Sequence, residues 1–253
     1  MILGKIPYLN TVPYFHFLSE RWLRQHSLVS ATPAQLGALA REGKLDAAPF
    51  SLVDAQGLVD SGAFEFLGDL GIAGRGEIRS IRLFGVADPR SLEGKAIAVT
   101  SHTATTVRLM EIWLRGRVGL KNFSLVPMGG KAAATLLIGD DALSRGLRPL
   151  PGEPLPIDLC AAWTEWTGLP FVFARWAVRK SVPEMQKREL QLSMLSAMEL
   201  AMDDLEIVSQ KAAEDTAFEP IFIESYLRGI SYRIGADEAA GAKLFLEKLA
   251  AAR

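Results

Sequence analysis

The chain has few of the residues that build disulfides and metal sites. Its 253 residues include one cysteine, Cys160, and three histidines. A single cysteine cannot form an intramolecular disulfide, which favours a protein of a reducing compartment. His16, His26 and His102 show no ligand spacing with one another, so we expect no metal centre. No glycine-rich phosphate loop follows a predicted strand, so we expect no organic cofactor either.

An excess of charge of one sign is also missing. Lysine and arginine number 28 against 29 acidic residues, for a net charge of −1. Such a chain has no strong field that would draw it to nucleic acid or to an anionic membrane. No apolar run approaches the roughly 18 uninterrupted residues of a membrane span. We therefore expect a small-molecule partner and neither nucleic acid nor membrane, while the oligomeric state stays open.

The first third of the chain alternates strand and helix patterns. A core strand is predicted from Ile2, and because it leaves no room for a signal peptide we expect a cytoplasmic protein. Thr32-Pro33-Ala34-Gln35 has the form of a capping box that opens a helix. Strands follow at 45–50 and 80–84, with a glycine-broken apolar segment at 64–76 between them. This β-α-β-α-β order is typical of a parallel sheet covered by helices.

A second unit is predicted to begin after Asp88-Pro89. It has strands at 96–99 and 135–138 and a helix at about 105–115. The apolar strand at 171–174 returns the chain to the first unit. Two helices follow, one opened by a capping box at Ser181-Val182-Pro183-Glu184 and one at about 236–251.

This order predicts an α/β protein with the two-lobed fold of a type II periplasmic binding protein. Lobe 1 is expected to be discontinuous and to comprise residues 1–86 and 172–253, and lobe 2 to comprise residues 88–170. The cleft between such lobes is the expected ligand site. A neutral amide, Asn10, stands where the first strand gives way to a helix, and such turns bind ligands in open α/β sheets.

Several motifs in order along the chain resemble those of one enzyme family. They are Tyr8-Leu9-Asn10-Thr11, Pro49-Phe50-Ser51, Ser80-Ile81-Arg82-Leu83, Ser101-His102-Thr103, the run 137–143 and the run from Asp158-Leu159 through Trp163 to Ala174. In these motifs the chain is similar to the chorismate dehydratases of the futalosine pathway of menaquinone biosynthesis. The resemblance implies a lyase that eliminates water from chorismate to give 3-[(1-carboxyvinyl)oxy]benzoate.

The implied substrate carries two carboxylates, so its site needs hydrogen-bond donors. Hydroxyls at strand ends fit this need, and so do the backbone N–H groups that open the helix after Thr103. The predicted substrate-binding residues are Ser51, Ser80, Ser101, Thr103, Ala104 and Asp140. Ala104 stands where the family usually has another serine, so only its backbone can take part. Asp140 either caps the following helix or orients a donor.

Asn10 is the predicted catalytic residue. Aromatisation of the product favours the reaction and the substrate's own carboxylate can take the ring proton, so orientation by an amide suffices. His102 is the competing general base. Two other functions stay open: a sister lyase of the same pathway that releases 1,4-dihydroxy-6-naphthoate, and a non-enzymatic cytoplasmic small-molecule-binding protein. The sister lyase has a cysteine-containing loop where this chain has Tyr8-Leu9-Asn10, which favours the dehydratase.

Overall fold

The computed structural model describes residues 1–102 and 105–252. The chain divides into two compact units. Unit 1 comprises Met1–Ala73 and Val172–Gly235, and unit 2 comprises Gly74–Phe171 and Ala236–Arg253. The chain therefore passes from one unit to the other three times, after Ala73, Phe171 and Gly235.

Unit 1 contains a six-stranded sheet in the order β11-β4-β10-β3-β1-β2. Its strands are β1 (Ile2–Lys5), β2 (Ser27–Ser30), β3 (Ala47–Ser51), β4 (Phe64–Gly74), β10 (Phe171–Arg179) and β11 (Ile230–Arg233). Strand β1 runs parallel to β3, as the sequence predicts, and also parallel to the strand β2, which the sequence did not predict. The returning strand β10 is antiparallel to β3, so the sheet is mixed.

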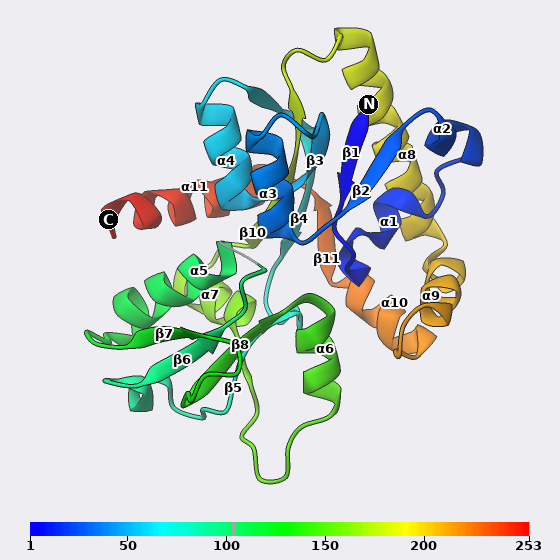
Figure 1. Cartoon of the computed structure of the whole chain (residues 1–253). Helices are drawn as coiled ribbons and strands as arrows, with labels where there is room; N and C mark the ends of the chain where they lie inside the picture. The colour runs from blue at the N-terminus through cyan, green and yellow to red at the C-terminus, as the bar shows by residue number, and fades with distance from the viewer. Residues whose placement is uncertain (103–104, 253) are drawn as a thin grey trace. The chain divides into compact units, whose positions relative to one another are not determined.

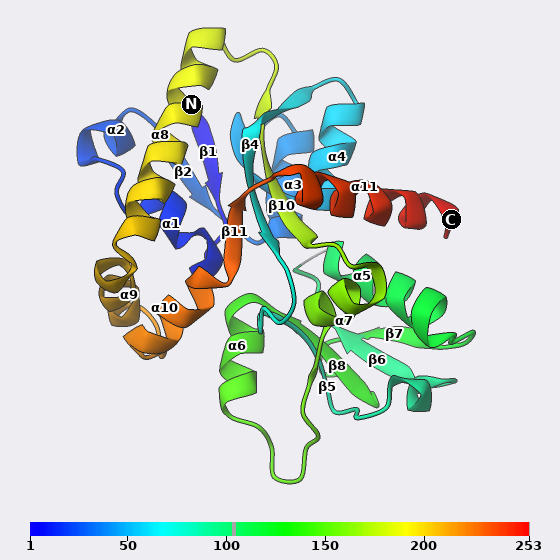
Figure 2. The ribbon, with the colours of Figure 1, turned by 180° about the vertical axis from the view of Figure 1, so that it is seen from behind.

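Helices of 4 to 20 residues and one 3-10 turn accompany this sheet. They are the 3-10 turn η1 (Leu9–Thr11), α1 (Val12–Phe15), α2 (Glu20–Arg24), α3 (Pro33–Arg41), α4 (Leu52–Asp60), α8 (Glu184–Asp203), α9 (Leu205–Glu214) and α10 (Pro220–Arg228). Helices α3 and α4 pack on β3 and on each other, and α1 packs on α8 (Figures 1 and 2). Leu36 of α3 and Phe50 of β3 belong to the fully buried core beneath α3 and α4.

Two predicted capping boxes have opposite outcomes. The one at the start of α3 is confirmed, since the Thr32 hydroxyl accepts from the Gln35 N–H and the Gln35 side chain accepts from the Thr32 N–H. The one at Ser181 is wrong, because α8 begins one residue after Pro183 and no side chain caps it. A residue before proline is pushed out of the helical region, so Val182 cannot be part of the helix.

Unit 2 contains a five-stranded sheet in the order β7-β6-β8-β5-β9. Its strands are β5 (Ile81–Phe84), β6 (Ala96–Val99), β7 (Ser124–Pro127), β8 (Ala134–Ile138) and β9 (Ile157–Asp158). Its helices are the 3-10 turn η2 (Pro89–Leu92), α5 (Thr105–Trp113), the π-helical turn η3 (Leu114–Val118), α6 (Gly139–Leu147), α7 (Leu159–Thr167) and α11 (Ala236–Ala251). Strand β6 is parallel to β7 and β8, whereas β5 is antiparallel to β8 and β9.

The predicted lobe boundaries need correction at two places. Residues 74–86 were expected in lobe 1, yet they lie in unit 2, where β5 pairs with β8 and β9. The last helix, α11, was also expected in lobe 1 and also lies in unit 2. Phe245 of α11 packs edge-to-face against Phe171 and Trp163, with ring centroids 5.1 and 6.1 Å away. These apolar contacts, which no local pattern reveals, hold α11 on unit 2.

Across residues 1–102 and 105–252, we find no helix with the length and apolar character needed to cross a membrane.

Candidate functional site

Asn10 lies in a short turn that is firmly held by its neighbours. Strand β1 ends at Lys5, and the single 3-10 turn η1 carries Leu9, Asn10 and Thr11. The Thr11 side chain is fully buried, and its hydroxyl is within 2.7 Å of the Ile6 carbonyl oxygen and 3.0 Å of that of Tyr8. Either contact closes the turn back onto the end of β1. The backbone at Asn10 is thereby fixed without help from its own side chain.

The amide oxygen of Asn10 lacks a hydrogen-bond partner among the residues that the structure describes. This atom, Oδ1, is buried. Buried polar atoms are almost always paired, because an unpaired one costs roughly 1–3 kcal/mol. A molecule that offers an O–H or N–H group at this position would satisfy the amide oxygen. The geometry therefore supports a ligand-contacting role for Asn10.

Ser51 has a different environment. It ends β3 and caps α4: its hydroxyl donates to Oδ2 of Asp54 over 2.7 Å and accepts from the Asp54 N–H at 3.4 Å. The other oxygen of Asp54 accepts from Nη1 of Arg41 at 2.8 Å. Gly37 makes room for this carboxylate, since a Cβ there would lie 2.6 Å from its carbon. The Ser51 proton is thus engaged within the protein.

The topology of unit 2 gathers three of the other predicted residues at one edge of its sheet. Strands β6 and β8 are parallel, so Ser101 and Asp140, which follow them, lie at the same edge. Ser80 immediately precedes the antiparallel strand β5 and reaches that edge too, where its carbonyl oxygen accepts from the Gly139 N–H at 2.8 Å. Ser80 is buried, Asp140 is half-buried and Ser101 is exposed. Thr103 and Ala104 lie outside the described residues.

Asp140 occupies the first turn of α6, and the helix starts at Gly139 rather than at Asp141. The N-cap of α6 is Ile138, so Asp140 is inside the helix and does not cap it through its side chain.

His102 lies in the turn after β6, where its N–H donates to the Thr100 hydroxyl at 3.2 Å. Within the part of the chain that the structure describes, no group of three or more His, Cys, Asp or Glu side chains could hold a metal ion.

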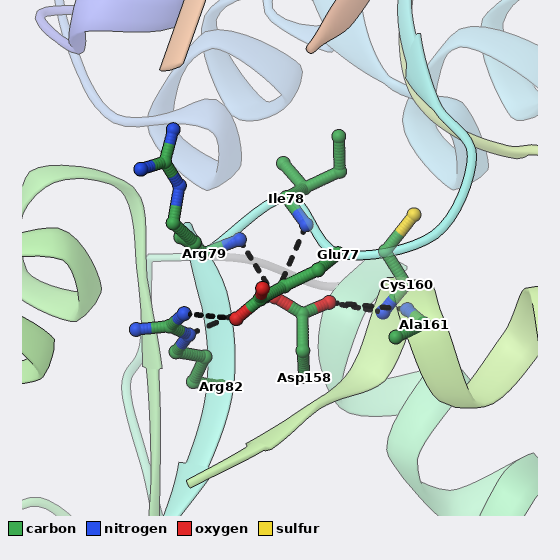
Figure 3. A network of polar contacts seen from close by, with 7 residues as sticks. All are labelled: Glu77, Ile78, Arg79, Arg82, Asp158, Cys160 and Ala161. Atoms are coloured by element: carbon green, nitrogen blue, oxygen red, sulfur yellow. Dashed lines mark hydrogen bonds and ion pairs between the residues drawn. The ribbon is translucent and has the colours of Figure 1, made fainter. Parts of the chain in front are cut away.

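A buried carboxylate that sequence reasoning did not select lies next to Ser80. Each oxygen of Asp158 accepts two backbone N–H groups (Figure 3). Oδ1 caps α7 through the N–H groups of Cys160 and Ala161, at 3.0 and 3.1 Å. Oδ2 accepts from Ile78 and Arg79, at 3.2 and 2.6 Å. An aspartate before an apolar helix was a readable capping signal, but the second pair of bonds comes from a segment about 80 residues away.

The positive charge of Arg82 lies close to the Asp158 carboxylate. Nε of Arg82 lies 3.7 Å from Oδ2 of Asp158, and its Nη2 contacts Glu77 at 2.5 Å. Burial raises the pKa of Asp158 above its ordinary value, against the backbone hydrogen bonds and the Arg82 charge, which lower it. Four N–H donors and a guanidinium nevertheless match the acceptor capacity of an ionised carboxylate.

The segment held by Asp158 has unusual backbone geometry. Arg79 has φ of +70°, and among the described residues it is the one non-glycine residue with positive φ. Residues other than glycine avoid this left-handed region because Cβ crowds the carbonyl group. The next residue is Ser80. The conformation that brings Ser80 to the edge of the sheet is therefore one that the chain adopts only under external support.

Each unit has one mixed β-sheet with helices, and the chain changes from one unit to the other three times. These two features define the class of protein to which the molecule belongs. The structure is similar to that of a protein from Archaeoglobus fulgidus, with a TM-score of 0.82, 17% identity and coverage of 99% of this chain and 97% of the other. It is also similar to the periplasmic aliphatic sulphonate binding protein SsuA from Escherichia coli, with a TM-score of 0.66, 16% identity and coverage of 98% and 91%. The predicted periplasmic-binding-protein-like fold is confirmed.

The sequence identifies the family within this fold. The chain belongs to the menaquinone biosynthesis family, whose profile matches residues 1–251. It is 27% identical over 266 residues to the chorismate dehydratase of Thermus thermophilus, covering 98% of this chain and 94% of that protein. It is 28% identical over 186 residues to the chorismate dehydratase of Campylobacter jejuni, covering 70% and 67%. The predicted resemblance to the chorismate dehydratases is confirmed.

Proposed function

We propose that this protein is a chorismate dehydratase, a lyase that eliminates water from chorismate to give 3-[(1-carboxyvinyl)oxy]benzoate. The observation that carries the proposal is the similarity to the Thermus thermophilus chorismate dehydratase over nearly the full length of both chains. Membership of the menaquinone biosynthesis family supports it. In this proposal the protein works in the cytoplasm, on the futalosine route to menaquinone, and needs neither metal nor organic cofactor.

The unpaired amide oxygen of Asn10 gives the proposal a structural anchor. Chorismate has a ring hydroxyl that can donate a hydrogen bond to this buried oxygen. The same hydroxyl is the leaving group, so the bond would fix it relative to the ring proton that must also depart. Because aromatisation drives the elimination, orientation is the main contribution required of the protein.

The proton needs an acceptor, and in this proposal the substrate supplies it. A carboxylate of chorismate takes the ring proton, the ring hydroxyl leaves, and proton and hydroxyl together make up the water that is lost. Ser80, Ser101 and Asp140 lie at one edge of the unit 2 sheet, where the two hydroxyls can bind a carboxylate. Thr103 and the backbone of Ala104, which the family resemblance also implies, would add donors.

The decisive experiment is to incubate the purified protein with chorismate and to identify the product by chromatography with ultraviolet detection. We expect stoichiometric formation of 3-[(1-carboxyvinyl)oxy]benzoate, with no change in samples that lack protein or contain heat-denatured protein. Binding of chorismate without conversion would instead assign the chain as a non-enzymatic binding protein. Absence of both binding and conversion would overturn the proposal and direct attention to the sister lyase reaction.

A further inference from the structure

The segment from Glu77 to Ser80 contains an apparent conflict between sequence and conformation. Arg79 adopts a left-handed backbone conformation for which glycine would be the ordinary choice, although Gly76 stands only three residues earlier. Such geometry persists only where the surroundings over-determine it, and it is found preferentially next to functional positions. The N–H groups of two consecutive residues of this segment, Ile78 and Arg79, donate to one acceptor.

Asp158 is that acceptor. Its Oδ2 atom receives the N–H groups of both Ile78 and Arg79, and this pair of bonds holds the local backbone conformation. Figure 3 shows the two N–H bonds converging on Asp158 from the connecting segment that leads into β5, while the other oxygen faces the first turn of α7. The carboxylate has a side-chain exposure of 6%, so water does not compete for these bonds.

We propose that Asp158 is a positioning residue for the active site, which locks the left-handed turn at Arg79 and thereby sets Ser80 at the edge of the unit 2 sheet. The inference rests on the proposed function to the extent that Ser80 binds the substrate. Asp158 itself does not touch the substrate. Its effect on turnover passes through two backbone hydrogen bonds and the conformation of one residue.

The chemistry of the contacts requires a carboxylate and not merely a polar side chain. Each oxygen accepts two N–H groups, so all four donors face an acceptor. An asparagine offers one acceptor oxygen, and its NH2 group would confront either the turn or the start of α7 with like donors. A serine is a good cap for α7 but is too short to span both segments.

The test separates capping from positioning with one substitution. Asp158→Ser retains a cap for α7 and removes the acceptor for Ile78 and Arg79. We expect kcat/KM for chorismate to fall by at least about tenfold, because displacement of a binding group by a fraction of an ångström has effects of this size. The amide hydrogens of Ile78, Arg79 and Ser80 should exchange with solvent faster in this variant than in the wild-type protein.

A second substitution tests the mechanism directly. Arg79→Gly removes the Cβ and lets the left-handed conformation form without support. In the Arg79→Gly background, Asp158→Ser should lower kcat/KM by less than about threefold, and this coupling is what a double-mutant cycle measures. Any direct contribution of the Arg79 side chain to kcat/KM cancels, because both proteins compared in the Arg79→Gly background lack that side chain. A purely structural role for Asp158 gives the same loss in both backgrounds and overturns the proposal.

Asp204→Ser is the matched control, because Asp204 also caps a helix, accepting from the Ile207 N–H at 3.4 Å, but lies in unit 1. It should leave kcat/KM unchanged. If the wild-type protein does not convert chorismate, the proposed function fails while amide exchange still decides the positioning role. Unchanged exchange at residues 78–80 in Asp158→Ser would refute that role whatever the activity.

Discussion

The Ser51 hydroxyl donates its hydrogen to the Asp54 carboxylate over 2.7 Å, and this bond decides what Ser51 can offer a ligand. A hydroxyl has one hydrogen, so a serine engaged in this way cannot also donate to a substrate carboxylate. The sequence predicted Ser51 as a donor to the substrate. The geometry favours a helix cap whose proton stays inside the protein.

We therefore predict that Ser51→Ala affects stability more than activity. Loss of an N-cap side chain costs about 1 kcal/mol, so the midpoint of denaturant unfolding should fall while KM changes by less than about twofold. Ser19→Ala is the matched control, because Ser19 caps α2 by accepting from the Trp22 N–H at 3.2 Å. A large rise in KM with unchanged stability would show that the Ser51 hydroxyl turns toward the substrate.

Asn10→Ala should have the opposite effect. The substitution removes a buried acceptor that bonds to no residue the structure describes, so stability should be preserved or slightly increased. Turnover should fall by at least about tenfold, equivalent to about 1.4 kcal/mol of transition-state stabilisation. The neighbouring Thr11→Val should be destabilising instead, since it breaks the hydroxyl contacts with Ile6 and Tyr8. Full activity in a folded Asn10→Ala protein would exclude the proposed mechanism.

Asn10→Asp refines the same test. It preserves shape but places a negative charge where a dianionic substrate is expected to bind. Binding should weaken at neutral pH and recover partly in acid, because protonation of the new carboxyl group removes the repulsion. The measurement is the pH dependence of KM or of the dissociation constant, with the wild-type protein as reference. An identical pH profile for both proteins would place the substrate charge away from Asn10.

Cys160 should be unreactive in the folded protein at any pH up to about 9. Its Sγ atom is buried and lies 3.3 Å from the Gly74 carbonyl oxygen. Burial and, to a smaller extent, the nearby Asp158 charge raise the pKa of the thiol far above its ordinary value. Thiol reagents should label the native protein slowly, with little acceleration between pH 7 and pH 9, whereas the denatured chain should react at once.

The same shift predicts how Cys160 links stability to pH. Because the folded pKa exceeds the unfolded one, the stabilising contribution is complete below the ordinary thiol pKa and declines as pH rises above it. Cys160→Ala should remove this decline in the free energy of unfolding between pH 8 and pH 10. Rapid labelling of the native protein at pH 7 would contradict the buried position of the thiol.

Gly241→Ala should destabilise the protein although alanine is the better helix former. Helix propensity favours alanine by about 1 kcal/mol, but a Cβ at Gly241 would lie 2.1 Å from the Pro170 carbonyl oxygen. The clash involves backbone atoms of both segments, so no side-chain rotation can relieve it. Helix α11 would therefore shift away from its aromatic contacts with Trp163 and Phe171. Thermal unfolding should show a clear loss. Gly57→Ala in α4, where nothing lies within 4 Å, is the control and should be neutral or stabilising.

Local sequence signals predicted the elements of this fold well where the decisive interactions are short-range. The capping box at Thr32 involves residues three positions apart, and strand β6 follows directly from its apolar residues. The edge strand β2 was not predicted, because Ser27–Ser30 is short, largely exposed and weakly apolar. Its pairing with β1 comes from the sheet and not from its own composition.

The residues of the candidate site were likewise predictable only where the signal is short-range. Asn10 could be selected because a polar amide between a core strand and the following helix is conspicuous in sequence. The role of Asp158 could not be, since it depends on bonds to residues 78 and 79, far away along the chain. The assignment of α11 failed for the same reason, as the partners of Phe245 are aromatic rings from two other segments. Contacts of high sequence separation leave no periodic signature.

The threefold passage of the chain between units has a consequence for synthesis on the ribosome. All of unit 1 and most of unit 2 are translated before residue 236, but the helix that packs on Trp163 and Phe171 emerges only after all of unit 1. Unit 2 must therefore wait with an exposed aromatic surface, whereas unit 1 has every strand of its sheet by residue 233. Newly made chains are most vulnerable to chaperone capture or proteolysis in that interval, and the arrival of the 16-residue helix α11 ends it.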